Sequence, residues 1–529
     1  MSAVARKIFN IAADAQKSSN LVIKDLVANE LVFAVVGPAG SGTSWVAKAL
    51  AERVKSDEVE ITVIKASDVI LDWARKNSFP VADSGRLARA RSLQDAGDAI
   101  RERDSAGVAV QLISAIRDNR KLLNEKSDSV GEKFKIFILD SLKHPAEVAL
   151  LRSVYQEAFC LIGVVCETEQ REKRLKDEKC RDSSAFDIEA FIARDEDSGI
   201  TNGQKVTETF HLADFFVNNT PERFLDDGNK GHKRENPLWD VNDQLGRLFD
   251  LLTHSQLVRP TPSETGMFHA HGAQMRSACL SRQVGAALLD QQGNLVSTGT
   301  NEVPRPGGGV YGGTFVNFGV EPEPDHRCAF SSRECSNNKV AEEIFSELVE
   351  TLPELQAIDQ NYLRKKLKKT ALGRLIEFSR AVHAEMDALF SAARQGASPV
   401  GTRMFVTTFP CHYCARHIVS AGVDEVQYIE PYPKSRALSL HGDAIAQSPE
   451  GWLAPSLPAT SGSNAKRAVL FRPFTGVAPR MYRRAFLKDR ALKDGSGNMS
   501  FGEPEWSSGL LRQSYQDVEN SLLENGSNG

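Results

Sequence analysis

The chain has 529 residues, of which 41% are hydrophobic, and its formal net charge is −4. This length is sufficient for two ordinary hydrophobic cores, and we expect two domains. The near-balanced charge excludes a global cationic field for duplex nucleic acid, so polynucleotide binding would need a local basic patch. Eight cysteines in so long a chain do not form a disulfide framework, and no apolar run or N-terminal leader predicts membrane insertion or secretion. We therefore expect a soluble, cytoplasmic protein.

The first strong signal is a buried-strand run, Glu30–Val36, followed by Gly37-Pro-Ala-Gly-Ser-Gly-Thr-Ser44 and a helix from Trp45 onward. The G-x-x-x-x-G spacing between a strand and a helix predicts a loop whose backbone N–H groups cradle phosphate. Thr43 stands where such loops carry lysine, which weakens the predicted contact with the outer phosphates. The predicted contacts to a nucleotide with Mg²⁺ are Gly37, Gly40, Gly42, Thr43, Ser44 and Asp140.

Further apolar runs at Phe134–Asp140 and Ala158–Cys166 predict more buried strands, the first ending in an acid like a Walker B strand. Strands alternating with helices predict a doubly wound parallel sheet. Together with Glu169–Leu175 and Ala213–Asn219, these segments resemble the P-loop kinase fold of nucleoside monophosphate kinases. Because the loop lysine is missing, we favour a scaffold or regulatory module over an active kinase.

The segment from Ser277 to Asn301 predicts a β-hairpin with strands over Val284–Leu289 and Leu295–Thr298. A long insert, about residues 304–372, follows it. Its charged sequence predicts two helices and suggests a lid or a contact surface; these helices are Asn338–Leu352 and Leu363–Lys369. The basic run Arg364–Lys369 is either a solvated helix face or a contact for RNA or an acidic neighbour.

Ala371–Arg394 has helix-forming composition and apolar positions near a period of 3.6, which predicts a helix carrying His383 and Glu385. Thr402–Phe409 predicts a strand. Pro410 follows this strand, and a helix is expected over Cys411–Ser420, ended by Gly422. The first turn of that helix favours thiolate at Cys411 and Cys414.

One imidazole and two thiolates, from His383, Cys411 and Cys414, are ligands that Zn²⁺ prefers, and they leave a fourth position for water as in catalytic sites. The two motifs, H-x-E and P-C-x-x-C, resemble the signature of zinc-dependent nucleobase deaminases. The resemblance implies that zinc activates water for attack on C4 of cytosine, while Glu385 carries protons as general acid and base. The alternative is a structural zinc site or a pair of reduced core thiols.

The hairpin sequence S-x-C-x-x-R-x-V-G-A, followed by S-T-G-T-N, resembles deoxycytidylate deaminases, in which Tyr stands at the position of Thr300. The resemblance implies that Asn301 binds the 3′-hydroxyl of the sugar and that the backbone around Ala384 meets the base. The alternative for Asn301 is a turn residue that tolerates the left-handed conformation. Cys279 matches a position used for a second, structural zinc in some phage members, although ordinary reduced thiols are favoured for it and for His326, Cys328 and Cys335 of the insert.

Val426–Arg436 predicts a strand that runs into a basic turn. Cations and a hydroxyl on a rigid turn suit substrate phosphates, and the residues concerned are Lys434, Ser435, Arg436 and His441. The alternative is a solvated loop without a role.

With P-Y-P-K-S, L-H-x-D and F-x-P-F-x-G-V-A-P-R-x-Y at Phe471–Tyr482, nearly the whole chain resembles bacterial anti-phage dCTP deaminases. The resemblance implies conversion of dCTP, and of dCMP, to the deoxyuridine nucleotide with release of ammonia, which drains the cytosine pool of an infecting phage. It also implies restraint by a small inhibitory RNA, and a homo-oligomer by analogy. The alternatives are a housekeeping dCMP deaminase, a polynucleotide cytidine deaminase with a regulatory P-loop domain, or a sensing protein.

The expected domain organisation follows from these segments. We predict a P-loop kinase-like domain over 1–225, a linker over 226–260, a cytidine-deaminase-like α/β/α domain over 261–490 and a flexible tail over 494–529.

Overall fold

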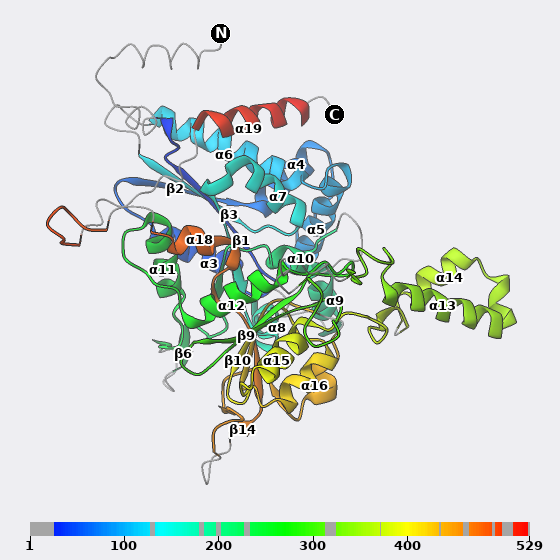
Figure 1. Cartoon of the computed structure of the whole chain (residues 1–529). Helices are drawn as coiled ribbons and strands as arrows, with labels where there is room; N and C mark the ends of the chain where they lie inside the picture. The colour runs from blue at the N-terminus through cyan, green and yellow to red at the C-terminus, as the bar shows by residue number, and fades with distance from the viewer. Residues whose placement is uncertain are drawn as a thin grey trace. The chain divides into compact units, whose positions relative to one another are not determined.

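The computed structural model forms two compact units, one of Met1–Arg259 with Thr475–Gly529 and one of Pro260–Phe474 (Figure 1). The second unit thus ends at Phe474, where the sequence had predicted residue 490. The structure describes residues 26–126, 133–178, 185–196, 203–226, 233–312, 324–370, 372–432, 435–458, 465–488, 492–499 and 512–526. No helix within these ranges combines the length and the apolar character needed to cross a bilayer.

Unit 1 contains a six-stranded sheet in the order β16-β5-β4-β1-β3-β2, in which only the edge strand β16 is antiparallel. Its two central strands are buried along their whole length, as expected for parallel strands covered on both faces. The predicted parallel sheet is therefore confirmed. The strands are β1 (Glu30–Val36), β2 (Val59–Lys65), β3 (Phe134–Asp140), β4 (Phe159–Val165), β5 (Phe215–Asn218) and β16 (Gly476–Val477), with a separate hairpin of β6 (Phe224–Asp226) and β7 (Lys233–Glu235).

The predicted linker over 226–260 is wrong, because this stretch contains β7 and a helix with an apolar buried face, α11 (Val241–Thr253). The other helices of unit 1 are α3 (Thr43–Arg53), α4 (Ala66–Lys76), α5 (Arg86–Arg103), α6 (Gly107–Lys126), α7 (Pro145–Tyr155), α8 (Thr168–Glu178), α9 (Ala185–Glu196), α10 (Val206–Phe210), α18 (Pro479–Phe486) and α19 (Arg512–Gly526).

The flexible tail predicted over 494–529 instead ends in a docked helix, α19, which lies beside α6 in Figure 1. Arg120 of α6 is buried between two carboxylates, with Nε 2.9 Å from Glu30 Oε1 and Nη1 2.6 Å from Glu519 Oε2. The Tyr515 hydroxyl donates to Glu30 at 3.0 Å, and the Tyr155 hydroxyl donates to Glu519 at 2.6 Å. A buried, fully hydrogen-bonded network therefore joins the C-terminal helix to the central sheet.

Removal of one carboxylate from this network should destabilise unit 1. We expect Glu519→Ala to lower the free energy of unfolding by about 3 kcal/mol, because Arg120 stays buried with one anionic partner fewer. A urea titration of the full chain measures the change. Glu524→Ala, at an exposed position of the same helix, is the control and should leave the midpoint unchanged. Equal midpoints for the two variants would contradict the assignment.

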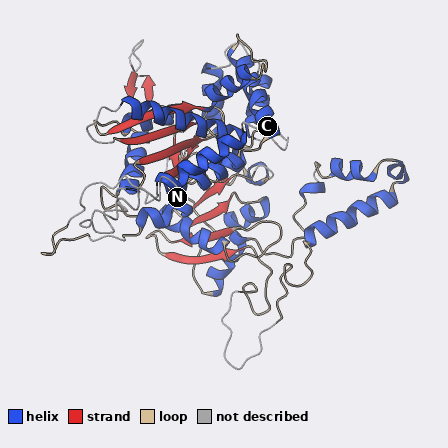
Figure 2. Cartoon of the chain, turned by 90° about the horizontal axis from the view of Figure 1, so that it is seen from above, coloured by secondary structure: helices blue, strands red, loops and turns tan. Residues whose placement is uncertain are grey.

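Unit 2 is built on a second six-stranded sheet, in the order β12-β15-β11-β10-β8-β9. The first four strands are parallel, and β8 and β9 form the predicted antiparallel hairpin. Figure 2 shows helices packed against the sheets, with the helices of the insert standing apart from them. The strands are β8 (Gly285–Leu289), β9 (Leu295–Thr300), β10 (Arg403–Thr408), β11 (Glu425–Glu430), β12 (Ile445–Ala446) and β15 (Val469–Pro473), with β13 (Trp452–Leu453) and β14 (Lys466–Arg467) as a separate pair.

The insert of unit 2 carries the two predicted helices, α13 (Ser336–Thr351) and α14 (Gln360–Leu367), which project from the rest of the unit in Figures 1 and 2. Residues 313–323 of the insert lie outside the described residues. Arg364 and Lys368 of the basic run lie 3.0 and 3.5 Å from the carboxylate of Glu342 on α13. Part of the basic charge is therefore neutralised within the insert itself.

The predicted helix over Ala371–Arg394 is wrong in its first half. The structure has a short 3₁₀ turn at Leu372–Arg374 and a helix, α15, only over Ala384–Arg394. Between them Val382 pairs with Glu302 through two backbone hydrogen bonds of 3.0 and 3.2 Å. This long-range pairing uses backbone groups that a helix would need for itself. The remaining helices of unit 2 are α12 (Pro262–Gln274), α16 (His412–Ser420) and α17 (Ala437–His441), with a 3₁₀ turn at Pro353–Ala357.

Candidate metal and active site

The three predicted zinc ligands lie at the starts of two helices. His383 precedes α15 as its N-cap residue and is thus not within the helix, contrary to the prediction. Cys411 is the N-cap residue of α16, and Cys414 lies in its first turn, where its backbone N–H faces Cys411 Sγ at 3.5 Å. The predicted strand and helix around the cysteines are confirmed, with bounds shifted by one residue.

The ligand atoms of these residues converge. His383 Nδ1 lies 3.4 Å from Cys411 Sγ and 3.4 Å from Cys414 Sγ. A tetrahedral zinc with bonds of about 2.05 Å to nitrogen and 2.3 Å to sulfur holds such atoms about 3.5 Å apart, so the separation fits. Both thiols are buried. Among the residues that the structure describes, this is the only group of three or more His, Cys, Asp or Glu side chains close enough to share an ion.

The electrostatics of the thiol pair favour a cation. A hydrogen bond with Cys414 and the proximity of His383 lower the pKa of Cys411 to about 4, against the effect of burial. Burial raises the pKa of Cys414 well above its usual range. Cys411 is therefore ready to bind as a thiolate, and a positive ion would offset the cost of ionising Cys414 in the same place.

Glu385 lies in the first turn of α15, two residues after His383, and the residue is 4% exposed. Burial, with a further contribution from the negative charge of Cys411, raises the pKa of Glu385 to about 7. The carboxyl can thus hold or release a proton near neutral pH, as a general acid and base must.

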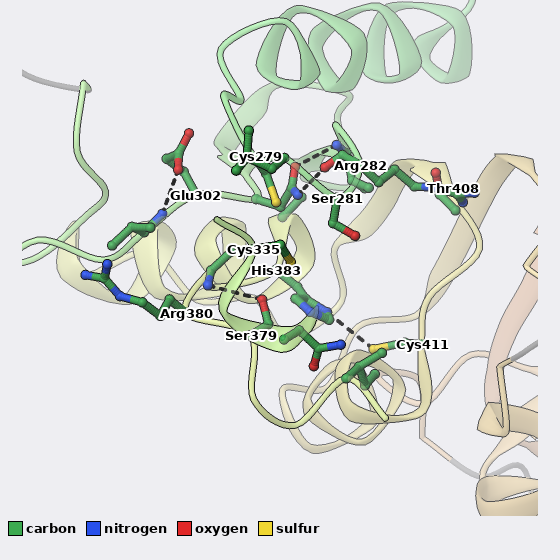
Figure 3. A pocket seen from close by; sticks show the side chains of 18 of the residues that line it. Cys279, Ser281, Arg282, Glu302, Cys335, Ser379, Arg380, His383, Thr408 and Cys411 are labelled. Atoms are coloured by element: carbon green, nitrogen blue, oxygen red, sulfur yellow. Dashed lines mark hydrogen bonds between the residues drawn. The ribbon is translucent and has the colours of Figure 1, made fainter. Parts of the chain in front are cut away.

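A cavity of about 340 Å³ adjoins the ligand group and is lined by His383, Ala384, Glu385, Cys411 and Asn301. Figure 3 shows His383 and Cys411 directed toward one another in the cavity wall, with Arg282, Ser281 and Thr408 on the opposite side. The volume is within the range of small-molecule sites.

Asn301 lies at the cavity as predicted, but its side chain has structural partners. Its Oδ1 accepts from the backbone N–H of Val284 at 2.7 Å, and its Nδ2 donates to the carbonyl of Arg282 at 2.5 Å. These bonds tie the end of β9 to the segment that leads into β8. Asn301 does not have a positive φ, so the interpretation as a left-handed turn residue is wrong.

Among the predicted phosphate contacts after β11 that the structure describes, Ser435, Arg436 and His441 do not line this cavity. Ser435 Oγ donates to the carbonyl of Pro410 at 2.8 Å and so supports the turn before Cys411. His441 ends α17, and Arg436 is the N-cap residue of that helix. Lys434 lies outside the described residues.

Two arginines that the sequence interpretation left without a role line the cavity, Arg282 and Arg380. Arg282 lies 3.1 Å from Glu430 Oε1, and its guanidinium lies 5.8 Å from the centre of the Tyr432 ring. Thr408 Oγ1 donates to the other oxygen of Glu430 at 3.0 Å. Arg282 belongs to the S-x-C-x-x-R motif, which was the available signal for its position near the site.

Cys279, Cys328 and Cys335 line the same cavity as free thiols. Within the described part of the chain they do not form a second ligand group, with or without His326. The second zinc and the reduced-thiol interpretation both stay predictions.

In unit 1 the predicted phosphate loop joins β1 to α3, which begins at Thr43 where the sequence had predicted Trp45. Gly40 and Gly42 have φ of +83° and +85°, a backbone conformation that glycine adopts without strain. Asp140 ends β3 and pairs in register with Val35 of β1. The loop residues and Asp140 thus occupy neighbouring strand ends, although nucleotide binding there stays a prediction.

Comparison with known proteins agrees with the geometry of unit 2. Residues 261–430 match the family model of the cytidine and deoxycytidylate deaminase zinc-binding region. The chain is 27% identical over 170 residues to the deoxycytidylate deaminase of Enterobacteria phage T2, covering 32% of this chain and 79% of the relative. It is 28% identical over 175 residues to the deoxycytidylate deaminase of Enterobacteria phage T4, covering 32% and 77%.

Among solved structures, the dCMP deaminase of cyanophage S-TIM5 in apo form is 17% identical, with 41% of this chain and 100% of that chain covered and a TM-score of 0.21. So low a TM-score adds nothing to the sequence matches. The matched region contains the hairpin, His383, Glu385, Cys411 and Cys414. The matches and the ligand group together support a nucleotide deaminase domain with a zinc-binding site in unit 2.

The metal content of the purified chain tests the ligand set. We expect about one zinc ion per chain, since the described residues offer one ligand group. Cys414→Ser should lose most of the zinc because a neutral hydroxyl replaces a thiolate ligand. Cys335→Ser, a matched change in the same cavity wall, should keep it. Elemental analysis by mass spectrometry gives the count, and zinc loss in Cys335→Ser would refute this assignment.

Proposed function

We propose that the chain catalyses zinc-dependent hydrolytic deamination of dCTP, and of dCMP, to the deoxyuridine nucleotide and ammonia. The observation that carries the proposal is the convergence of the ligand atoms of His383, Cys411 and Cys414 beside a cavity that the buried Glu385 also lines. The family match over 261–430 supports the same class of reaction. When bound by the three ligands, zinc supplies a Lewis acid that lowers the pKa of water.

Glu385 moves the protons in this proposal. Deamination forms a bond between C4 and the oxygen of water and breaks the bond between C4 and the exocyclic nitrogen. One proton of water must reach ring N3 and another must reach the departing nitrogen. Glu385 lines the cavity two residues from His383, and it is the carboxyl group that we assign to both transfers. The backbone of Ala384 and the side chain of Asn301 are proposed to position base and sugar.

Two arginines of the cavity wall are suited to the phosphate of a nucleotide substrate, although Glu302 and Glu385 line the same cavity and Arg282 is paired with Glu430. Arg282 and Arg380 contribute two cations, and guanidinium groups bind phosphate with paired hydrogen bonds. Ser435, His441 and Lys434 remain proposals as phosphate contacts. Preference for dCTP, removal of cytosine nucleotides in defence against phage, an inhibitory RNA and a homo-oligomer rest on the resemblance of motifs along the chain.

A substrate panel tests the proposed function. The purified, zinc-loaded chain is incubated separately with dCTP, dCMP, CTP and single-stranded DNA, and ammonia and uracil products are measured. We expect turnover of dCTP and dCMP. Release of ammonia from DNA alone would contradict the proposal and indicate a polynucleotide deaminase. Turnover of dCMP but not of dCTP would indicate a dCMP deaminase.

Substitution of the proton carrier tests its role separately from metal binding. Glu385→Gln keeps the size of the side chain, so we expect full zinc content with turnover reduced by about a thousandfold. Glu350→Gln, at an exposed position on α13, is the control and should retain both properties. Zinc is measured by elemental analysis and turnover by ammonia release. Retained turnover in Glu385→Gln would remove this residue from the mechanism.

A further inference from the structure

The phosphate loop of unit 1 binds a carboxylate of its own chain. The backbone N–H of Ala39, within the loop, donates to Oδ2 of Asp195 at 2.7 Å. Asp195 lies near the end of α9, and its side chain is 4% exposed. Loop amides of this kind are suited to the oxygens of a phosphate group. Here a carboxylate oxygen takes one of those hydrogen bonds.

A lysine from outside the loop lies at the same point. Lys143 Nζ is 3.0 Å from Asp195 Oδ1 and 3.2 Å from the carbonyl oxygen of Gly37. Lys143 follows β3 by three residues, so the connection between β3 and α7 brings it to the loop. Thr43 holds the position where a phosphate loop usually has its lysine. The missing positive charge is therefore present, supplied from another segment.

The interior of the loop also contains a buried hydroxyl without a partner. Ser41 Oγ has no hydrogen-bond partner, and Ser41 is 0% exposed. A Cβ atom added to Gly37 would lie 2.5 Å from this oxygen, so the hydroxyl faces into the loop. The backbone is held there by Asn219, whose Nδ2 donates to the Ser41 carbonyl at 2.8 Å. Buried polar groups normally have partners, and a phosphate oxygen would provide one.

A second cation stands beside the loop. A Cβ atom on Gly42 would lie 3.8 Å from Arg174 Nη1 of α8. The hydrogen bonds of the Arg174 guanidinium go to Cys166 Sγ and to the carbonyls of Thr220 and Pro221. Lys143 and Arg174 thus place two positive charges near the loop, together with the N-terminal end of α3, and Asp195 is the carboxylate that contacts a loop amide. The cations and the backbone amides of the loop suit an anion with more than one charge.

We propose that this loop binds the phosphate groups of a nucleoside triphosphate, with Lys143 in the role of the missing loop lysine and Asp195 as a built-in competitor. Phosphate enters when the Asp195 carboxylate leaves the Ala39 amide, and Lys143 then pairs with phosphate. Because only chains with a free loop bind, the tethered carboxylate lowers the apparent affinity. The inference concerns unit 1 and does not depend on the chemistry of unit 2.

Calorimetric titration of the full chain with Mg·ATP and, separately, with magnesium tripolyphosphate tests this inference. Asp195→Asn keeps an oxygen that can accept from Ala39 but removes the charge, so we expect affinity to rise about tenfold. Lys143→Gln should lower affinity by about tenfold or more, as for loss of a hydrogen bond between charged groups. Each substitution should change the affinity for Mg·ATP and the affinity for tripolyphosphate in the same direction, because the altered contacts are to phosphate.

Matched controls use the same substitutions elsewhere in unit 1. Asp187→Asn changes a carboxylate of the same helix that pairs with Arg91 at 3.0 Å. Lys121→Gln changes a lysine at an exposed position of α6. Both should bind ATP as the unaltered chain does. Unchanged affinity in Asp195→Asn and Lys143→Gln, or no binding of either ligand to the unaltered chain and Asp195→Asn, would overturn the proposal.

Hydrogen exchange on the unaltered chain gives a result that does not depend on the folding of a variant. Addition of saturating Mg·ATP should increase amide exchange over residues 185–196, because the contact that holds Asp195 is lost. Exchange should decrease over the loop itself. Unchanged or slower exchange in 185–196 with ATP bound would refute the displacement of Asp195.

Discussion

The close approach of α15 to β9 is the constraint on which the metal and active site depends. A Cβ atom on Gly299 would lie 2.1 Å from the carbonyl oxygen of Ala384 and 2.2 Å from the nitrogen of Ala388, so helix and strand touch backbone to backbone. Ser297 Oγ donates to the Ala388 carbonyl at 2.8 Å, and the Thr300 N–H donates to Asp387 at 3.1 Å. These contacts fix the first turn of α15, and therefore the positions of the ligand before it and the carboxyl within it.

The same sheet fixes the two sulfur ligands. β10 lies between β8 and β11, and its end leads through Phe409 and Pro410 to the start of α16. Both helices that bear ligands thus begin at the metal site. Their free N–H groups and positive dipole ends face the place where Cys411 and Glu385 concentrate negative charge. Negative groups that would repel one another are held together by backbone dipoles and, when it binds, by the metal.

Sequence patterns predicted the structure correctly where it depends on residues that are close in the chain. Continuous apolar runs predicted β1 and β3 with the bounds observed, and the spacing of His383, Cys411 and Cys414 predicted the ligand group. Sequence patterns gave wrong predictions where contacts with residues distant in the chain determine the structure. Apolar periodicity predicted a longer helix than α15, because it does not show that Val382 pairs with Glu302. The helix α19 packs through the contact of Glu519 with Arg120, which cannot be predicted from the polar sequence of the tail. The cavity arginines could not be predicted because Arg282 is positioned by the hairpin and Arg380 by the non-helical segment before α15.

The two candidate sites contain buried or half-buried charges of opposite sign. In unit 2 the Cys411 thiolate lies beside a second buried thiol and a buried carboxyl, so this ligand group favours a cation. In unit 1 the cations Lys143 and Arg174 lie beside the phosphate loop, and the Asp195 carboxylate pairs with Lys143. Since an isolated buried charge is costly, each arrangement favours a ligand of the missing sign. The Asp195 carboxylate of α9 accepts from the Ala39 N–H of the loop and pairs with Lys143, so one carboxylate links the loop to its substitute cation.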